Sequence, residues 1–240
     1  MKIKVDTCLI VFAKNPIPNQ VKTRLIPTLA SEQAASLYRA FLIDWCEIIK
    51  QLSNTDLIIA YAPPEGLLDL QNLLGEDFTY VAQKGKDLGE RLTNATQWAA
   101  DNGYNKILFV GSDSPTLPLS YVSQGVDSLN ASDVILGPSM DGGYYLIGFS
   151  KNKLNTMVPY IFEDIAWSTE HVFLQTVERI HSIAVKLTLL PPWYDVDTPD
   201  DLSFLHAHIK AMRLANEKVQ ANRTEGYLLE LVKENSIWVN

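Results

Sequence analysis

Two kinds of apolar pattern alternate along most of the chain. Short runs of consecutive apolar residues, bounded by polar or turn-forming residues, are typical of strands that are buried on both faces. Longer segments between them have apolar residues at helical spacing, which predicts helices. The predicted strands are 8–13, 56–61, 78–83, 106–111, 133–136, 144–149 and 184–190. The predicted helices are 31–52, 88–102, 118–129, 168–181 and 198–215, and Pro63-Pro64 should begin a turn or short helix.

This alternation predicts an α/β fold, with a mostly parallel mixed sheet and helices on both of its faces. The chain has 240 residues, which is long enough for one large domain or two small ones. No linker rich in Pro, Gly or Ser divides the sequence, so we expect a single domain over 1–216. A helical extension is predicted for 217–240. Its apolar residues could pack on the core or on a second subunit, as in a homodimer: Tyr227, Leu228, Leu231 and Trp238.

The composition indicates an ordinary folded protein with an acidic balance. Hydrophobic residues make up 47% of the chain and charged residues 20%, which permits a sizeable core. A formal net charge of −8 disfavours binding to nucleic acid or to an anionic membrane, since both need a basic surface. The apolar run 8–13 is too short to span a membrane and lacks a cleavage site, so we expect a cytoplasmic protein. Cys8 and Cys46 have no metal-ligand spacing and are predicted to be free core residues.

Cations nevertheless gather in two short loops. The loop after the first predicted strand contains two prolines, Lys14, Lys22 and Arg24 but no acid. This composition suits phosphate oxygens, with which Arg24 can make a bidentate contact, although an ordinary basic surface loop stays open as an alternative. In the second loop, Arg91 could contact a phosphate or pair with an acid. The glycine patterns of Rossmann dehydrogenases, Walker-type ATPases and serine hydrolases are absent from the sequence.

Two acidic segments follow predicted strands and indicate a metal site. Asp113 comes directly after the strand 106–111, where burial of an unpaired carboxylate would be costly. Asp197 lies just before the helix 198–215. Ligands of open α/β sheets bind at the carboxyl ends of the strands, so these two side chains could converge and hold Mg²⁺ or Mn²⁺ together with substrate phosphates. The alternatives are that Asp113 caps a turn and that the other acids of 195–201 belong to an ordinary helix start.

The segment Asp141-Gly142-Gly143-Tyr144 is a further candidate site. Two glycines after an acid permit a ligand to approach the backbone closely. A hairpin turn between the strands 133–136 and 144–149 explains the same residues equally well.

Five of these segments, in this order along the chain, resemble the motifs of a known family. They are Ala13-Lys14 with Lys22-Thr23-Arg24-Leu25, Gly85 with Asp87-Leu88-Gly89 and Arg91, Gly111-Ser112-Asp113-Ser114-Pro115, Asp141-Gly142-Gly143-Tyr144-Tyr145, and Asp195-Val196-Asp197-Thr198-Pro199. Over about 8–205, the chain is similar to the bacterial GT-A-type, DUF2064-like glycosyltransferases of unknown substrate. These proteins are related to nucleotidyltransferases that build cofactors, such as the phospholactate and molybdenum-cofactor guanylyltransferases.

The resemblance implies a GT-A (nucleotide-diphospho-sugar transferase) fold and a role for each matching residue. The first loop would embrace the nucleotide phosphates, and the nucleotide-binding residues would be Ala13, Lys14, Lys22, Arg24, Gly85, Arg91 and Ser112. The metal would be held by Asp113 and Asp197. The acceptor would lie along Asp141, Gly142, Gly143 and Tyr144. The predicted catalytic residues are Asp113, Asp141 and Lys22, with Asp141 as a base that orients the acceptor.

Two positions depart from the family pattern. Asn19 stands where the family often has glycine, although asparagine tolerates a left-handed backbone. Gly111 stands where a D-x-D glycosyltransferase has its first acid, so this segment offers one carboxylate instead of two. The leading hypothesis is metal-dependent transfer of a sugar from a nucleotide-sugar to a small-molecule acceptor. The alternatives are nucleotidyl transfer from a nucleoside triphosphate to a phosphorylated acceptor, with release of pyrophosphate, and a non-catalytic nucleotide-binding protein.

Overall fold

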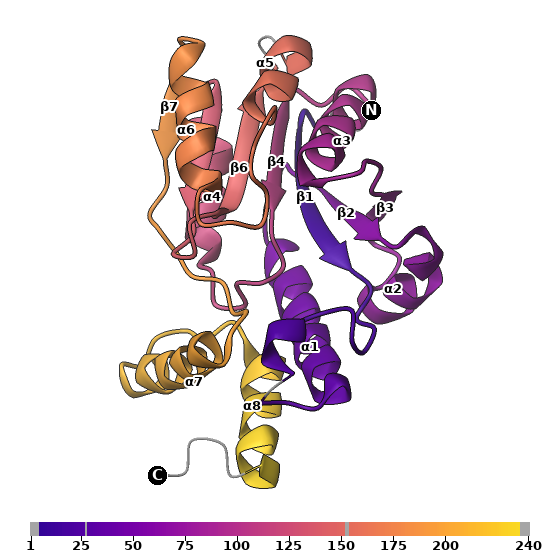
Figure 1. The fold of residues 1–240 in the computed structure, drawn as a ribbon, viewed down its shortest axis with the longest axis vertical. Coiled ribbons are helices and arrows are strands. Elements are labelled where there is room, and N and C mark those ends of the chain that lie inside the picture. Colours follow the sequence, from indigo (N-terminus) through magenta and orange to yellow (C-terminus); the bar gives the residue numbers. More distant parts are fainter. Residues whose placement is uncertain (1–4, 27, 152–153, 236–240) are drawn as a thin grey trace.

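The computed structural model describes residues 5–26, 28–151 and 154–235 (Figure 1). Within these residues one seven-stranded sheet has the order β3-β2-β1-β4-β6-β5-β7. The strands are β1 (Thr7–Lys14), β2 (Asp56–Ala62), β3 (Thr79–Ala82), β4 (Lys106–Val110), β5 (Val134–Pro138), β6 (Tyr144–Ser150) and β7 (Leu187–Leu189). Strand β6 is antiparallel to both of its neighbours, whereas the other strand pairs are parallel. The mixed, mostly parallel sheet expected from the sequence is therefore confirmed.

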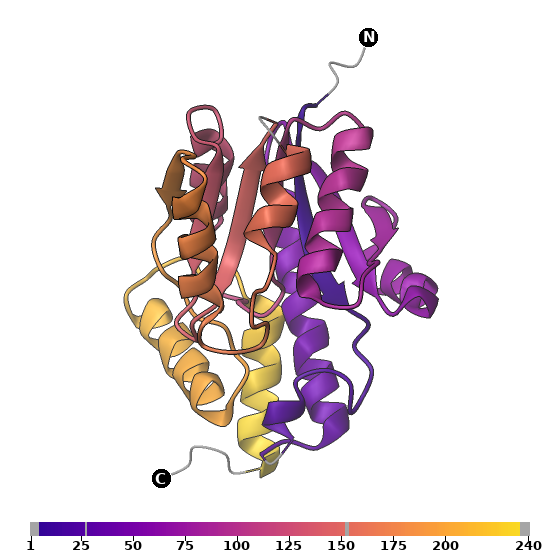
Figure 2. The ribbon, with the colours of Figure 1, turned by 45° about the horizontal axis from the view of Figure 1, so that its top comes forward.

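Helices cover both faces of the sheet (Figures 1 and 2). One apolar cluster receives side chains from α1 (Ser31–Ile49), α2 (Leu67–Leu74), α4 (Leu119–Ser128), α7 (Pro199–Leu214) and α8 (Asn222–Asn235). The opposite cluster receives side chains from α3 (Leu88–Asp101), α5 (Leu154–Ile161) and α6 (Val172–Ser182). Two short 3₁₀ helices are η1 (Thr23–Leu25) and η2 (Pro64–Gly66). No helix in the described ranges combines the length and the apolar character needed to cross a membrane.

Strand β1 shows why the buried strands read as unbroken apolar runs. Leu9 and Val11 belong to the cluster under α1, whereas Cys8 and Ile10 belong to the cluster under α3, and all four are at most 1% exposed. Successive side chains of a strand point to opposite faces, so a sheet covered on both faces leaves no polar positions between the apolar ones. Cys8 and Cys46 are both buried and free, as predicted.

Helix α5 is the main element that the sequence prediction missed. Its buried residues Leu154, Met157, Val158 and Ile161 follow the i, i+3, i+4, i+7 spacing of an amphipathic helix. Pro159 lies inside this helix and obscures the pattern, because proline removes a backbone donor and normally ends a helix. The other predicted elements agree within a few residues, except that β7 is shorter than expected and the helix before it begins at Val172.

The C-terminal extension packs on the core of its own chain. Leu228 is 1% exposed and Leu231 0% exposed, in the same cluster as α1. The carboxylate of Asp44, on α1, accepts hydrogen bonds from the backbone N–H groups of Arg223 at 3.0 Å and Thr224 at 2.8 Å. A side chain of α1 thus satisfies the first donors of α8. The domain boundary at 217 and a second subunit stay predictions, and Trp238 lies outside the described residues.

The strand order places a topological switch point between β1 and β4. From β1 the chain continues to its neighbour β2 on one side, whereas β4 lies on the other side. The connections that leave these two strands diverge, and ligands of open α/β sheets bind where such connections part. The loops after β1 and β4 and the segment before α7 meet at this edge of the sheet (Figure 1).

Candidate active site

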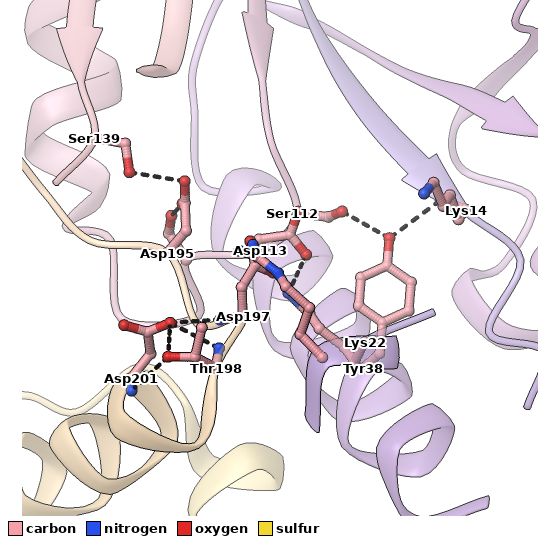
Figure 3. Close-up of polar contacts among 12 residues, drawn as sticks. Lys14, Lys22, Tyr38, Ser112, Asp113, Ser139, Asp195, Asp197, Thr198 and Asp201 are labelled. Carbon is pink, nitrogen blue, oxygen red and sulfur yellow. Dashed lines mark hydrogen bonds and ion pairs between the residues drawn. The ribbon is translucent and has the colours of Figure 1, made fainter. Parts of the chain in front are cut away.

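Two aspartates that are far apart in the sequence converge on one lysine (Figure 3). Asp113 lies in the loop after β4, and Asp197 directly precedes α7. Lys22 Nζ contacts Oδ1 of Asp113 and lies 2.9 Å from Oδ1 of Asp197. A backbone hydrogen bond of 2.9 Å from Val196 N to the Asp113 carbonyl joins the two loops. The structure thus brings the two aspartates together at the switch point, while their binding of a metal stays a prediction.

The ammonium group of Lys22 is enclosed by the protein. The exposed fraction of its side chain is 3%, against 41% for Asp113 and 29% for Asp197. Its Nζ lies 5.7 Å from the ring centroid of Tyr38 and 5.5 Å from that of Phe41, within range of cation–π attraction. Burial alone would lower the pKa of Lys22, but the two carboxylates raise it above its usual range. The lysine therefore holds a permanent positive charge between the two acids.

The loop after β1 bends sharply to deliver its cations. Lys22 has a φ of 48° and Asn19 a φ of 64°, both in the left-handed region. Asparagine adopts this conformation readily, which agrees with its presence where the family often has glycine. Arg24, in η1, has an Nη2 that lies 2.5 Å from Oδ2 of Asp197, and its side chain is 62% exposed. Lys14 is exposed at the end of β1. This edge of the sheet therefore carries one enclosed and two accessible cations.

Asp197 is fixed by the start of α7. Asp201 Oδ2 accepts hydrogen bonds from the backbone N–H groups of Asp197 at 3.1 Å and Thr198 at 2.7 Å. Thr198 Oγ1 in turn accepts from Asp201 N at 3.3 Å, which completes a capping box. Burial raises the pKa of Asp197, but Lys22 and Arg24 lower it more, so the net shift is downward. The helix start predicted from Thr198-Pro199 is confirmed, and it presents an ionised carboxylate to Lys22 and Arg24.

A chain of hydrogen bonds ties the loop after β4 to β1 and α1. Lys14 N donates to the hydroxyl of Tyr38 at 3.1 Å, and Ser112 Oγ donates to the Phe12 carbonyl at 3.1 Å. The Ser112 proton is thereby used, so Tyr38 donates across the 2.7 Å that separates the two hydroxyls. Ser112 is 4% exposed, and its hydroxyl is fully engaged within the protein. Its predicted contact with the nucleotide stays a prediction, whereas Tyr38 is a supporting residue that no motif indicated.

Asp195 is a largely buried carboxylate that sequence analysis left without a role. It accepts hydrogen bonds from Ser114 Oγ and, at 2.8 Å, from Ser139 Oγ. Burial raises its pKa, the charges of Asp113 and Asp141 add to this, and the two hydroxyls oppose it, with a net pKa of about 6. The carboxylate thus joins the loops after β4 and β5 to the segment before α7. The sequence offered one signal for this contact: Ser114 directly follows Asp113, and Asp195 lies two residues before Asp197.

The segment 141–144 forms the hairpin turn between β5 and β6. Asp141 is exposed, and its Oδ1 accepts a hydrogen bond from Gly143 N at 2.9 Å. Gly142 has a φ of 89°, and a Cβ there would lie 2.3 Å from the Glu170 carbonyl oxygen, so only glycine fits. Tyr144 packs against the cluster under α3, with its hydroxyl buried. The hairpin interpretation is therefore confirmed, and the acceptor role of these residues stays a prediction.

The second cationic loop is held to α3. Arg91 Nε donates to the Gly85 carbonyl at 3.2 Å, and Asp87 caps the helix by accepting from Glu90 N at 2.8 Å. Within the described residues, no hydrogen bond or ion pair joins Gly85 or Arg91 to the two aspartates. The end of β3 does reach the centre of the sheet, because Gln83 Nε2 donates to the Ala13 carbonyl at 3.3 Å. The nucleotide-binding roles of Ala13, Gly85 and Arg91 stay predictions.

The two aspartates fit a divalent cation that takes further ligands from a substrate. Over the ranges that the structure covers, no group of three or more His, Cys, Asp or Glu is arranged to hold a metal. Two partly exposed carboxylates that already share one cation are nevertheless a donor set that Mg²⁺ commonly uses together with phosphate oxygens. Asp113 and Asp197 would hold such an ion.

Sequence comparisons show similarity to one family and to a group of enzymes. The family model described as "Uncharacterized protein conserved in bacteria (DUF2064)" matches residues 47–169. The 2-phospho-L-lactate guanylyltransferase of Methanothermobacter thermautotrophicus is 26% identical over 210 residues, which cover 85% of this chain and 86% of the relative. The enzyme of the same name from Methanocaldococcus infernus is 26% identical over 193 residues, 79% of this chain and 81% of the relative.

Solved structures support the fold. A Desulfovibrio desulfuricans G20 protein, provisionally called a nucleotide-diphospho-sugar transferase, has a TM-score of 0.85 and 35% identity, covering 96% of this chain and 98% of that chain. The 4-diphosphocytidyl-2C-methyl-D-erythritol synthase of Anaerococcus prevotii has a TM-score of 0.58 at 10% identity, covering 87% and 98%, and shows the fold alone. The fold of the nucleotide-diphospho-sugar transferases, expected from the sequence, is confirmed.

Proposed function

The chain belongs to the DUF2064 family, and from this premise we propose that it is a metal-dependent nucleotidyltransferase. It would transfer a nucleoside monophosphate group from a nucleoside triphosphate to a phosphorylated small molecule and release pyrophosphate. The observation that carries the proposal is the meeting of Lys22 and Arg24 with Asp113 and Asp197 at the switch point of the sheet. Cations for phosphate oxygens and carboxylates for a metal are thus adjacent, as phosphoryl transfer requires.

Two features favour a triphosphate over a nucleotide-sugar as the donor. Lys14 ends β1, and Lys22 and Arg24 follow it. A triphosphate has more negative charge for these three cations to balance than the diphosphate of a nucleotide-sugar. Gly111 leaves a single carboxylate after β4 where a D-x-D glycosyltransferase has two. The 26% identical relatives named as guanylyltransferases, of which over four fifths is covered, support the same choice.

The reaction would be an in-line displacement at the α-phosphorus of the triphosphate. An oxygen of the acceptor phosphate attacks this phosphorus, and the bond to the oxygen that bridges the α- and β-phosphates breaks. Pyrophosphate leaves with that electron pair. A metal held by Asp113 and Asp197 would supply positive charge that offsets the negative charge developing on the leaving group. Arg24, whose side chain is largely exposed, can make a bidentate contact with the departing phosphates.

This chemistry makes little demand for a strong base. A phosphate monoester has a second pKa of about 6, so its oxygen is already ionised at neutral pH. Asp141 is exposed and receives a hydrogen bond from Gly143 N. It would therefore orient the acceptor and keep the turn in shape, with no proton to remove.

Glycosyl transfer is the second candidate function. It is favoured by the 35% identical Desulfovibrio desulfuricans protein and its provisional name. The same aspartates and cations would then bind the diphosphate of a nucleotide-sugar, and a nucleoside diphosphate would leave instead of pyrophosphate.

The leaving group distinguishes the two reactions. The protein would be incubated with Mg²⁺, the four nucleoside triphosphates or a set of nucleotide-sugars, and a panel of phosphorylated hydroxy acids that includes 2-phospho-L-lactate. We expect pyrophosphate with a triphosphate donor, and little with Asp113→Asn. Asp127→Asn, an exposed acid on α4, serves as the control and should react like the wild type. Release of a nucleoside diphosphate would support glycosyl transfer, and nucleotide binding without any turnover would support a non-catalytic protein.

A further inference from the structure

Lys22 stands at the point on which the two predicted metal ligands converge. Its Nζ contacts Asp113 and lies 2.9 Å from Asp197, with only 3% of the side chain exposed. A Mg²⁺ ion bound by both carboxylates needs oxygens at about 2.1 Å, and the ammonium group fills the space between those oxygens. Two cations at this separation would also repel each other, since the ammonium group is enclosed by the protein. The ammonium and a metal therefore exclude each other.

We propose that the ammonium group of Lys22 occupies the metal site in the nucleotide-free protein. Metal binding then depends on the nucleotide, which draws Lys22 away from the two carboxylates. This inference rests on the proposed function, since it takes Asp113 and Asp197 as the metal ligands. Arg24 does not share the role, because it contacts Asp197 alone and its side chain is 62% exposed.

The surroundings of Lys22 explain why a metal ion alone cannot displace it. Its stem is buried, and the rings of Tyr38 and Phe41 lie beside the ammonium. A divalent ion that arrives alone would leave this buried charge with no anion, which is costly. A triphosphate changes the balance, because its oxygens accept the protons of Lys22 while it also supplies ligands to the metal. The lysine then moves from carboxylate to phosphate as metal and nucleotide enter together.

Without the ammonium group of Lys22, metal binding should no longer depend on nucleotide binding. In Lys22→Gln and Lys22→Met, Asp113 and Asp197 have no cation between them, so a metal can enter without a nucleotide. Methionine also places an uncharged, apolar side chain beside the two rings. Lys22→Arg keeps the charge and should still exclude the metal. Lys14→Gln is the matched control, because it removes one charge from the same loop at an exposed position.

The experiment measures Mn²⁺ binding without nucleotide by the loss of the free-ion electron paramagnetic resonance signal. With each of the four nucleoside triphosphates, which bind Mn²⁺ themselves, binding to the protein is measured by calorimetry against a blank that contains Mn²⁺ and the triphosphate alone. Melting curves first identify the variants that fold. We expect Mn²⁺ alone to bind Lys22→Gln or Lys22→Met at least about tenfold more tightly than the wild type, within the usual range of coupling between sites. The affinity of Lys22→Arg and Lys14→Gln for Mn²⁺ alone should stay close to that of the wild type.

Each of the other results contradicts the inference in a recognisable way. If neither neutral variant that folds binds Mn²⁺ more tightly than the wild type, while triphosphates still promote Mn²⁺ binding, Lys22 does not exclude the metal and the proposed function survives. The inference also fails if Lys14→Gln gains as much affinity, since a general change of charge then explains the effect. If Mn²⁺ binds to no protein even with triphosphate, the metal site fails, and the proposed function fails with it.

Discussion

Two lysines of one loop have opposite surroundings. Lys14 is exposed at the end of β1, whereas Lys22, eight positions later, is enclosed between two carboxylates and two rings. Both are equally polar in the sequence. Only the left-handed backbone at Lys22 and the convergence of three chain segments decide which lysine is buried. A cationic motif therefore predicts phosphate binding in general, but the separate task of each cation comes from the fold.

Substitution of Asp113 should affect the site more than the fold. Asp113→Asn removes one of the two carboxylates beside Lys22, but Asp197 remains at 2.9 Å and the Asp113 side chain is 41% exposed. We expect a loss of about 1–2 kcal/mol in the free energy of unfolding and no metal-dependent binding of nucleotide. Calorimetry with and without Mg²⁺ measures the binding, and urea unfolding measures the stability. Unchanged metal-dependent affinity would contradict the assignment of Asp113 as a ligand.

Asp195 should make stability depend on pH. Burial, the first cause, and the charge of Asp113 raise its pKa to about 6 in the folded protein, against about 3.9 in an unfolded chain. Because the folded pKa is the higher one, the contribution is fully present below about pH 4 and is lost as the pH rises through about 6. Asp195→Asn, which cannot ionise, should therefore gain stability relative to the wild type over this interval.

Urea unfolding in a metal chelator from about pH 4 to pH 7 tests this effect. The chelator ensures that metal binding next to Asp195 does not contribute. A constant difference between Asp195→Asn and the wild type across that interval would show that the Asp195 pKa is not raised.

At the scale of elements, two neighbouring leucines of α8 distinguish the contribution of packing to stability from that of helix propensity. Leu228 is 1% exposed, and Leu229 is 50% exposed. Leu228→Ala should lower the free energy of unfolding by about 2–4 kcal/mol, and Leu229→Ala by less than about 1 kcal/mol. Chemical denaturation of the two variants measures the difference. Equal effects would mean that α8 does not pack on α1 in solution.

The contact between Asp44 and α8 provides a second test of the same helix pair. Asp44→Ala leaves the backbone N–H groups of Arg223 and Thr224 without their acceptor, which should cost about 2 kcal/mol of stability. Glu47, one turn along α1, makes only an exposed ion pair with Arg223 at 3.3 Å, so Glu47→Ala should cost less than about 0.5 kcal/mol. Thermal unfolding of both variants checks the order, and the reverse order would exclude the capping role.

The elements that the sequence predicts well are those with an unbroken local pattern. The strand at Lys106–Val110 and the helix that begins after Thr198 each follow from a short stretch of residues. Helix α5 was missed because Pro159 outweighed four correctly spaced apolar residues. The partners of Asp195 were not predicted, because Ser114 and Ser139 lie 81 and 56 positions away along the chain, and the position of Ser114 beside Asp113 does not identify the group it binds. The positions of the motifs in the sequence were therefore enough to locate the candidate site, but the contacts of each side chain are known only from the structure.

At the scale of the whole molecule, the candidate site forms only when the chain is folded. Lys22, Asp113 and Asp197 come from the beginning, middle and end of the chain, so an unfolded chain cannot bind the ligand set. Mg²⁺ with the preferred triphosphate should therefore stabilise the protein, by about 2.7 kcal/mol at a ligand concentration of 100 times its Kd. Melting curves with both ligands, with either one alone, and with a chelator measure this. A full shift with triphosphate in chelator would contradict the need for metal.

Gly111 stands at the end of β4, beside the site, without a steric reason for being glycine. A Cβ built there would meet only the Tyr145 carbonyl oxygen, at 3.9 Å. A Cβ is therefore accommodated at this position without a close contact. The number of carboxylates in this loop is thus not set by crowding at the end of β4, and the scaffold leaves it free to follow the chemistry of the donor.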